Sequence, residues 1–122
     1  MIQGIGLDVV ELERIERVCQ RNPKFVDRIL TPQEKERYYT LSSRRQIEYL
    51  SGRFAAKEAF AKALGTGIGT HCAFTDVEVL NDQQGAPYLL FKGEKVNAFI
   101  TITHTNTVAA AQVIRVEGRI DK

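Results

Sequence analysis

Apolar residues and glycines dominate the start of the chain. Residues 2–10 combine Ile, Leu and Val with two glycines, which predicts a buried strand that leads into a turn or a helix. Asp8 lies near the C-terminal end of this predicted strand. Over residues 11–20, Leu12, Ile15 and Cys19 recur at intervals of three and four among charged residues, and this spacing indicates an amphipathic helix.

Two further helix starts are marked by a capping side chain followed by proline. They are Asn22-Pro23 and Thr31-Pro32, and proline is favoured at the first position of a helix because its missing N–H needs no partner there. Glu34 lies three residues after Thr31, which completes a capping box at the second of these starts. We therefore expect short helices after both prolines.

A long stretch without helix breakers follows. Ser43 and Gln46 offer another capping box, and between Ser43 and Leu64 the chain has no proline and a single glycine. This pattern predicts one long central helix that ends at Gly65. The glycines of GTGIG at 65–69 then break the regular structure, and they match neither the P-loop nor the dinucleotide-binding fingerprint.

The C-terminal half consists of short β-rich segments between turn signals. Phe74–Leu80 and Pro87–Phe91 predict a hairpin, and Ala98–His104 and Val108–Val116 predict a second antiparallel pair. Together with the helices of the first half, these segments predict an α+β fold in which a long central helix packs on a mostly antiparallel sheet joined by the N-terminal strand. A chain of 122 residues suits a single domain, 1–122.

Composition narrows the function classes. The net charge is only +2, but many Lys and Arg residues lie between Arg14 and Arg53, so we expect a local basic surface and no general nucleic-acid binding. Cys19 and Cys72 form no CxxC pattern and are interpreted as reduced thiols. The N-terminus has no basic segment before its apolar run and no A-x-A-like cleavage site, so we expect no signal peptide, and no apolar stretch approaches the roughly 20 residues that span a bilayer. We therefore expect a cytoplasmic protein without membrane partners.

Charged residues on the long helix are the candidate chemistry. Glu58 and Lys62 share a face, as do Arg53 and Lys57. A solvated face with two charge pairs explains the spacing, but the surrounding small and aromatic residues favour charges that have partners or ligands. Asp8 either caps the next helix or joins Glu58 as a second oxygen ligand of Mg²⁺. In the latter case the basic residues balance phosphate charge.

Three segments resemble the acyl-carrier-protein synthase family, the short class of phosphopantetheinyl transferases. They are GIGLD at 4–8, RFAAKEAFAKALGTG at 53–67 and ITHT at 102–105, and the match extends to DRILT at 27–31 and AAAQV at 109–113. Thr101 and Thr103 stand where the family commonly has serines, a change that keeps the hydroxyl. The resemblance implies the phosphopantetheinyl transferase fold.

The resemblance also implies an activity and a site. The family transfers 4'-phosphopantetheine from coenzyme A to a serine of apo acyl carrier protein for fatty acid biosynthesis, leaving adenosine 3',5'-bisphosphate. The resemblance implies that Asp8 and Glu58 are Mg²⁺ ligands and that Lys62 contacts the phosphates. The coenzyme A residues expected here are Arg53, Lys57, Gly65, Thr66, His104 and Thr105.

By the same resemblance, the carrier protein docks on the basic first helix and its continuation. The residues concerned are Arg14, Arg17, Arg21, Lys24, Phe25 and Arg28. The family is a homotrimer with active sites at subunit interfaces. From the residues alone, two alternatives remain: the basic surface is a solvated helix face, and His104 has a structural role. The alternative function is a noncatalytic carrier-protein or nucleotide-binding module; a nucleic-acid domain is disfavoured by the near-neutral charge.

Overall fold

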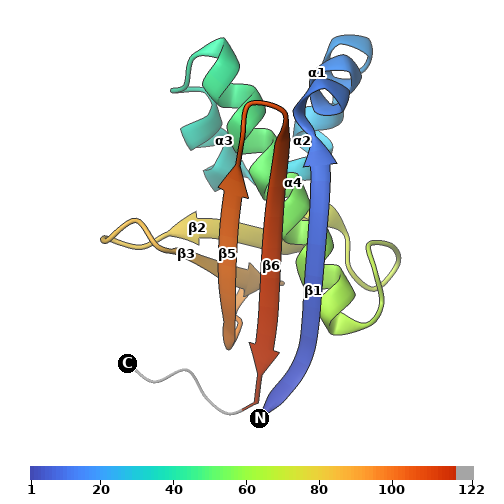
Figure 1. Cartoon of the computed structure of the whole chain (residues 1–122), viewed down its shortest axis with the longest axis vertical. Coiled ribbons are helices and arrows are strands. Elements are labelled where there is room, and N and C mark those ends of the chain that lie inside the picture. The colour runs from blue at the N-terminus through green and yellow to red at the C-terminus, as the bar shows by residue number, and fades with distance from the viewer. Residues whose placement is uncertain (118–122) are drawn as a thin grey trace.

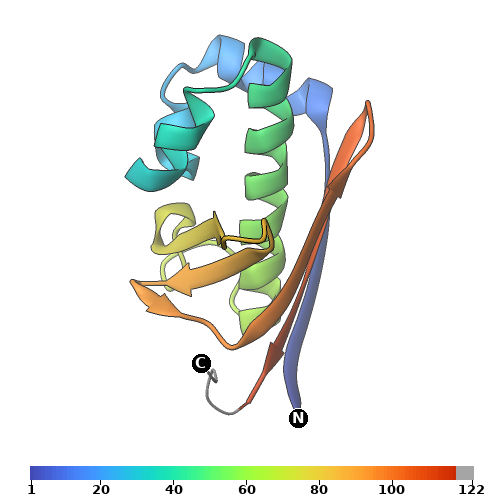
Figure 2. The same ribbon diagram turned by 90° about the vertical axis from the view of Figure 1, so that its left-hand side faces the viewer.

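A 22-residue helix stands at the centre of the molecule, between two small antiparallel sheets. The computed structural model describes residues 1–117, and the central helix is α4 (Ser43–Leu64). The first sheet has the order β1 (Ile2–Glu11), β6 (Val108–Val116), β5 (Ala98–His104), and the second has the order β2 (Val77–Asn81), β3 (Pro87–Phe91), β4 (Glu94–Lys95). Figures 1 and 2 show the first sheet along one side of α4 and the second sheet across the other.

Three short helices gather at the end of α4 where that helix begins. They are α1 (Leu12–Arg21), α2 (Phe25–Ile29) and α3 (Pro32–Tyr38), and a 3₁₀ turn at Phe74–Asp76 precedes β2. Figure 2 shows them clustered around the first turns of α4. Over residues 1–117, none of these helices combines the length and the apolar character that crossing a bilayer requires.

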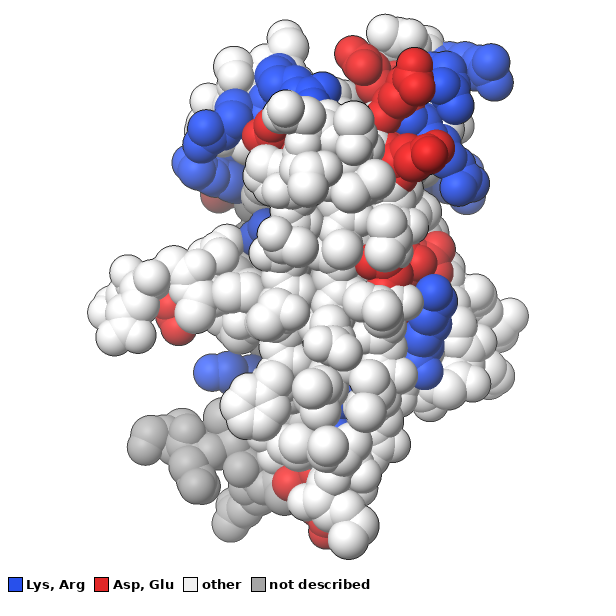
Figure 3. All heavy atoms as spheres, in the orientation of Figure 1, with Lys and Arg blue, Asp and Glu red and all other residues white. Residues whose placement is uncertain are grey.

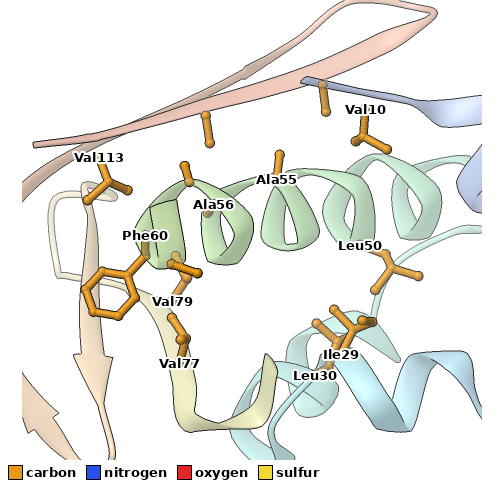
Figure 4. Close-up of a cluster of buried hydrophobic side chains, with 14 of the residues drawn as sticks. Val10, Ile29, Leu30, Leu50, Ala55, Ala56, Phe60, Val77, Val79 and Val113 are labelled. Carbon is orange, nitrogen blue, oxygen red and sulfur yellow. The ribbon is translucent and has the colours of Figure 1, made fainter. Parts of the chain in front are cut away.

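The predicted α+β architecture with a long central helix is confirmed, but the prediction of one sheet is wrong. The strands form two separate three-stranded sheets. The reason lies in α4, which is buried on more than one side. Val10 and Val113 cover the alanines of α4 from the first sheet, whereas Val77 and Val79 meet Phe60 from the second (Figure 4). An apolar helix of this kind needs cover on both sides.

The helix boundaries follow most of the sequence signals. The capping box of Thr31 and Glu34 is confirmed: Glu34 N–H donates to Thr31 Oγ1, and Thr31 N–H donates to Glu34 Oε1 at 2.8 Å. Gly65 caps the end of α4 with a φ of 90°. The start at Asn22-Pro23 is wrong, because Asn22 instead caps the end of α1 and α2 begins at Phe25.

Two other boundaries differ by a few residues. The N-cap of α4 is Ser42, without a side-chain hydrogen bond, so the predicted capping box at Ser43 is wrong. Phe74–Asp76 forms a 3₁₀ turn, and the strand begins only at Val77. The hairpin of β5 and β6 has the predicted bounds.

The outer face of the first sheet is apolar and exposed. Strand residues alternate between the two faces, so the side chains next to those that meet α4 point away from the helix. Four of them are 55–69% exposed: Ile5, Leu7, Val9 and Phe99. Side chains of this size seldom lie so open in a row on the surface of a monomer.

Candidate active site

Strand β1 and helix α4 meet backbone to backbone at two glycines. A Cβ atom added at Gly4 would lie 2.0 Å from the carbonyl oxygen of Ala63, and one added at Gly6 would lie 1.8 Å from that of Ala59. No side chain fits at either position, because glycine alone lets a backbone approach this closely. The glycines of GIGLD therefore allow the helix to lie directly on the strand.

This contact sets the level of Asp8 along α4. Asp8 lies on the same strand face as Gly4 and Gly6, because side chains two residues apart point the same way. The two glycine contacts show that α4 runs opposite to β1. Two residues of strand advance about 6.6 Å and four residues of helix about 6 Å. One further step along both elements brings Asp8 to the helical turn 55–58, which ends in Glu58.

Lys62 holds Asp8 from the next turn of α4. Its Nζ donates to Asp8 Oδ1 at 3.1 Å and to the carbonyl oxygen of Leu7 at 3.0 Å. The Asp8 side chain is 16% exposed, whereas that of Lys62 is half exposed. Burial, and next the negative charge of Asp8, raise the pKa of Glu58 above the ordinary value of 4.5. The charges of Lys62 and Arg14 oppose this shift of the pKa.

The two carboxylates fit a magnesium ion that substrate completes. Within residues 1–117 no group of three His, Cys, Asp or Glu side chains is placed to hold a metal ion. Mg²⁺, however, is commonly held by one or two carboxylates together with water and substrate phosphate oxygens. Burial raises the pKa of Glu58 most, and the repulsion from Asp8 adds to it; a bound dication would offset both effects. Asp8 and Glu58 are the residues that would hold this ion.

The chain leaves α4 directly beside these charges. Gly65 donates its N–H to the carbonyl oxygen of Lys62 at 3.0 Å, and Gly67 donates to that of Ala61 at 3.0 Å. The hydroxyl of Thr66 donates to the carbonyl oxygen of Gly67, also at 3.0 Å. Gly65 and Thr66 thus continue from the turn that carries Lys62. Their contact with coenzyme A stays a prediction.

Arg53 lies on a different side of α4. It is 9% exposed, and its Nη2 donates to Asn81 Oδ1 at 2.7 Å and to the carbonyl oxygen of Val79 at 3.3 Å. Its guanidinium carbon lies 4.3 Å from the ring centre of Tyr49. Burial is the main cause that lowers the pKa of Arg53. In the part of the chain that the structure describes, its Nε is buried and has no hydrogen-bond partner.

A cavity opens beside Arg53 and His104. It has a volume of about 200 Å³, and a neighbouring cavity of about 510 Å³ shares Arg53 with it. We call the two together the arginine cavity, because Arg37 and Arg53 line both and Arg45 lines the first. His104 ends β5, with its Nε2 4.0 Å from Glu48 Oε1. The cavity is therefore rich in positive charge, as an anion site requires.

Thr105 has a clear role within the fold. Its Oγ1 accepts hydrogen bonds from the backbone N–H groups of Thr107 at 3.2 Å and Val108 at 3.1 Å. Its own N–H donates to the carbonyl oxygen of Val108 at 2.8 Å. Thr105 thus organises the turn between β5 and β6 that follows His104. A contact between Thr105 and coenzyme A stays a prediction.

The predicted site residues therefore form two groups in one chain. Asp8 lies on β1 and His104 on β5, at opposite edges of the first sheet with β6 between them (Figure 1). Two strand spacings separate these edges by about 10 Å. None of Asp8, Glu58 and Lys62 lines the arginine cavity. Neither of these two cavities therefore unites both groups.

Lys57 does not belong to either group, and its prediction as a coenzyme A contact is corrected by the structure. Its side chain is 0% exposed, and its Nζ lies 2.6 Å from Glu34 Oε1 and 2.5 Å from the carbonyl oxygen of Ile29. Burial lowers the pKa of Lys57, and the Glu34 carboxylate opposes that shift. A lysine with both partners inside the core has no path to a phosphate in solution.

The predicted docking residues lie together on α1 and α2. Figure 3 shows basic side chains gathered over this end of the molecule, with acidic side chains beside them. Arg17 pairs with Glu13 at 3.6 Å, but within residues 1–117 no ion pair occupies the other four exposed cations: Arg14, Arg21, Lys24 and Arg28. Phe25 adds an apolar contact, since its ring packs against that of Phe54 at 6.1 Å between centres.

Some residues of the arginine cavity and of the docking surface were not found by the sequence analysis. Arg37, Arg45 and Tyr49 line the arginine cavity, and Phe74 extends the aromatic row from Phe54 at 5.2 Å. Arg45 and Tyr49 lie on the same helix as Arg53, so helical spacing alone was a signal for them. Arg37 comes from α3 and Phe74 from the turn before β2, and no local pattern connects either with its neighbours.

The sequence matches the model of the 4'-phosphopantetheinyl transferase superfamily over residues 4–114, and the chain belongs to this superfamily. It is 53% identical over 114 residues to the holo-[acyl-carrier-protein] synthase of Anoxybacillus flavithermus, covering 93% of this chain and 95% of that protein. The holo-[acyl-carrier-protein] synthase of a Geobacillus species is 51% identical, with coverage of 93% and 96%.

Solved structures of the same class share the fold. The holo-(acyl-carrier-protein) synthase of Bacillus anthracis, in complex with coenzyme A (3',5'-ADP), superposes with a TM-score of 0.84 at 44% identity, covering 94% of this chain and 96% of that one. The Helicobacter pylori synthase, in complex with coenzyme A, gives a TM-score of 0.80 at 29% identity and covers 92% and 99%. The predicted phosphopantetheinyl transferase fold is confirmed.

Proposed function

We propose that this protein transfers the 4'-phosphopantetheine of coenzyme A to a serine of apo acyl carrier protein, in a Mg²⁺-dependent reaction that serves fatty acid biosynthesis. One observation carries the proposal: two glycines press α4 onto β1, so that Asp8 and Glu58 come together beside Lys62. The membership of the superfamily supports it, as do the relatives that are holo-[acyl-carrier-protein] synthases. Those solved with coenzyme A or 3',5'-ADP indicate the donor.

The residues of this chain divide the work of phosphoryl transfer. Asp8 and Glu58 would hold Mg²⁺, which when bound would neutralise charge on the pyrophosphate of coenzyme A. Lys62 adds a positive charge at the same place; its side chain is half exposed, and its ammonium group donates two of its three hydrogens within the chain, which leaves the third for a phosphate oxygen. Positioning and charge neutralisation account for most of the acceleration in this chemistry. The site thus needs no covalent intermediate.

The bonds change in one displacement. The serine hydroxyl of the carrier protein attacks the β-phosphorus of coenzyme A, a new phosphodiester bond forms, and the bond to the α-phosphate breaks. The leaving group is adenosine 3',5'-bisphosphate, and the hydroxyl proton leaves to a base. The positive charge of Lys62 stabilises the charge that develops on the leaving group.

We infer that two copies of the chain build each site, within a homotrimer. The arginine cavity supplies cations for the nucleotide end of coenzyme A, but it lies apart from Asp8 and Glu58 in the single chain. The neighbouring copy would cover the exposed apolar face of the first sheet, which consists of Ile5, Leu7, Val9 and Phe99. A ring closes when each copy presents its acidic pair to the arginine cavity of the next.

Subunit complementation tests this arrangement. An Asp8→Asn/Glu58→Gln chain and an Arg53→Ala/His104→Ala chain should each be inactive alone. Mixed in equal amounts and reassembled, they should recover about a quarter of the wild-type activity, since that share of interfaces joins an intact acidic pair to an intact cavity. Activity that stays absent after confirmed mixing would contradict a shared site.

We also propose that the exposed cations of α1 and α2 receive the carrier protein. Arg14, Arg21, Lys24 and Arg28 lack ion-pair partners within residues 1–117, and acidic helical surfaces bind such patches.

The reaction is assigned to the cytoplasm because Cys19 and Cys72 are both free thiols.

Intact-mass spectrometry of an apo acyl carrier protein tests the activity itself. With this protein, coenzyme A and Mg²⁺, the carrier should gain the mass of one phosphopantetheine arm, and EDTA should prevent the gain. Glu58→Gln should fold normally but turn over at a small fraction of the wild-type rate, even at saturating Mg²⁺. No mass gain with a folded, oligomeric protein would favour a noncatalytic carrier-protein or nucleotide-binding module.

A further inference from the structure

Within residues 1–117, Lys57 and Glu34 form the one ion pair whose side chains are both fully buried. Both side chains are 0% exposed, and they join α4 to α3. Lys57 Nζ donates to Glu34 Oε1 at 2.6 Å and to the carbonyl oxygen of Ile29 at 2.5 Å. Neither residue reaches the acidic pair or the arginine cavity. Their function must therefore be sought in what they hold in place.

The contacts of Glu34 extend from helix α3 to strand β2. Its Oε1 accepts the N–H of Thr31 at 2.8 Å, and its Oε2 accepts the N–H of Val79 at 2.7 Å. The carbonyl oxygen of the same Val79 accepts from Arg53. One carboxylate thus links α3, α4 and β2, and the strand it holds also holds Arg53.

Stability alone is a poor explanation for this pair. A buried ion pair is often no more stabilising than well-packed apolar residues of similar size, because both charges lose their hydration. In some proteins such a pair instead selects one arrangement among several that pack equally well. The face of α4 that meets the first sheet gives a reason for such selection, since it consists mainly of alanines: Ala55, Ala56, Ala59 and Ala63. Small side chains offer few ridges to resist rotation or sliding of a helix.

The position of Lys57 in α4 ties this pair to the acidic pair. Successive residues of a helix are turned by about 100°, so Lys57 points to α3 and β2 when Glu58 points to β1. Arg53 lies one turn before Lys57 and on the same side. Any rotation of α4 that released Lys57 from Glu34 would turn Glu58 relative to Asp8 and would move Arg53 relative to its cavity.

We propose that Lys57 and Glu34 are positioning residues, which fix the rotation of α4 and thereby the placement of Glu58 opposite Asp8. The inference rests on the proposed function, because it gives the buried pair a role in assembling the metal ligands. Loss of the pair should weaken metal binding and lower kcat even in a protein that stays folded. Displacements near 1 Å suffice for losses of about a hundredfold in catalysis.

The test removes both charges and keeps the volume. In Lys57→Met/Glu34→Gln no buried charge is left unpaired, so the variant avoids the large destabilisation expected of Lys57→Met alone. Binding of Mn²⁺ in the presence of coenzyme A, followed by the EPR signal of free Mn²⁺, reports on the ligands without turnover. We expect the dissociation constant to rise about tenfold or more, and kcat with Mg²⁺ to fall in parallel. Chemical denaturation measures the folded fraction.

A second variant and a matched control complete the test. Glu34→Asp keeps both charges but shortens the reach to Lys57, and it should weaken Mn²⁺ binding by a smaller factor. The control Lys35→Met/Asp27→Asn removes a surface ion pair of 2.9 Å from the same region and should leave Mn²⁺ binding unchanged. If folded Lys57→Met/Glu34→Gln binds Mn²⁺ and turns over as the wild type does, the positioning role is overturned. If the wild type itself shows no coenzyme-dependent Mn²⁺ binding and no transfer, the proposed function is overturned with it.

Discussion

Replacement of Gly6 by alanine tests whether the contact of β1 with α4 assembles the site. The added Cβ would lie 1.8 Å from the carbonyl oxygen of Ala59, whereas real Cβ atoms do not approach below 3.0 Å. The helix and the strand must therefore separate by at least 3.0 − 1.8 = 1.2 Å at this point. The obstacle is backbone, so no side-chain rotation relieves it. Asp8 is two residues away on the same strand and moves with it.

Two measured effects should follow from this separation. Overpacking of this kind costs about 1–3 kcal/mol, which for a chain of this size corresponds to a fall in Tm of roughly 4–12 °C. A misplacement of about 1 Å between Asp8 and Glu58 should lower kcat about a hundredfold. The rate is followed by intact-mass spectrometry of the carrier protein at a temperature where both proteins are folded, and Tm by circular dichroism.

Gly69→Ala is the matched control. Nothing lies within 4 Å of a Cβ added there, and the backbone of Gly69 does not adopt a positive φ. This variant should keep the wild-type Tm and rate. If Gly6→Ala also kept both, the close approach of β1 and α4 would not be what places the carboxylates, and the reasoning would be refuted.

Three further predictions concern the charges and the exposed sheet. Lys62→Met removes a charge that lowers the pKa of Glu58. The acidic limb of the pH profile of kcat/KM for coenzyme A should therefore move to higher pH. A limb that stays in place or moves to lower pH would contradict the interaction between Lys62 and Glu58. Arg21→Glu/Arg28→Glu should raise KM for the carrier protein about tenfold or more while KM for coenzyme A changes little; equal effects on both substrates would argue against docking. Leu7→Asp places a charge on the exposed apolar face of the first sheet. It should yield a folded monomer, measured by light scattering, without transfer activity in the mass assay. A fully active monomer would exclude a site shared between subunits.

Local patterns predicted most of the fold. The apolar spacing of α1, the absence of helix breakers in α4 and the β-rich segments of β5 and β6 are each contained in one stretch of chain, and the structure confirms the elements they predict. The division into two sheets was not predictable in this way. It depends on which strands pair and on which side of α4 they pack, and these choices involve residues far apart in the sequence.

In the candidate site, too, local spacing predicted some residues, and contacts between distant residues decided the others. Glu58 and Lys62 were recognisable because four residues of helix place them on one face, and the structure brings Asp8, a candidate ligand from the sequence, beside them through the bond to Lys62. Lys57 has the same spacing from Arg53, but spacing does not reveal whether a helix face is buried. Its partner Glu34 lies 23 residues away, in a capping box whose local role already explained that carboxylate.

The shared carboxylate of Glu34 has a consequence for the order of folding. In the unfolded chain only the Thr31 partner of Glu34 is near in sequence, since Val79 lies 45 residues further along. A helix of seven residues is too short to persist alone in water. Its capping carboxylate is completed only when α4 and β2 arrive with Lys57 and Val79. Helix α3 therefore condenses together with the core, although its sequence carries the clearest helix-start signal in the chain.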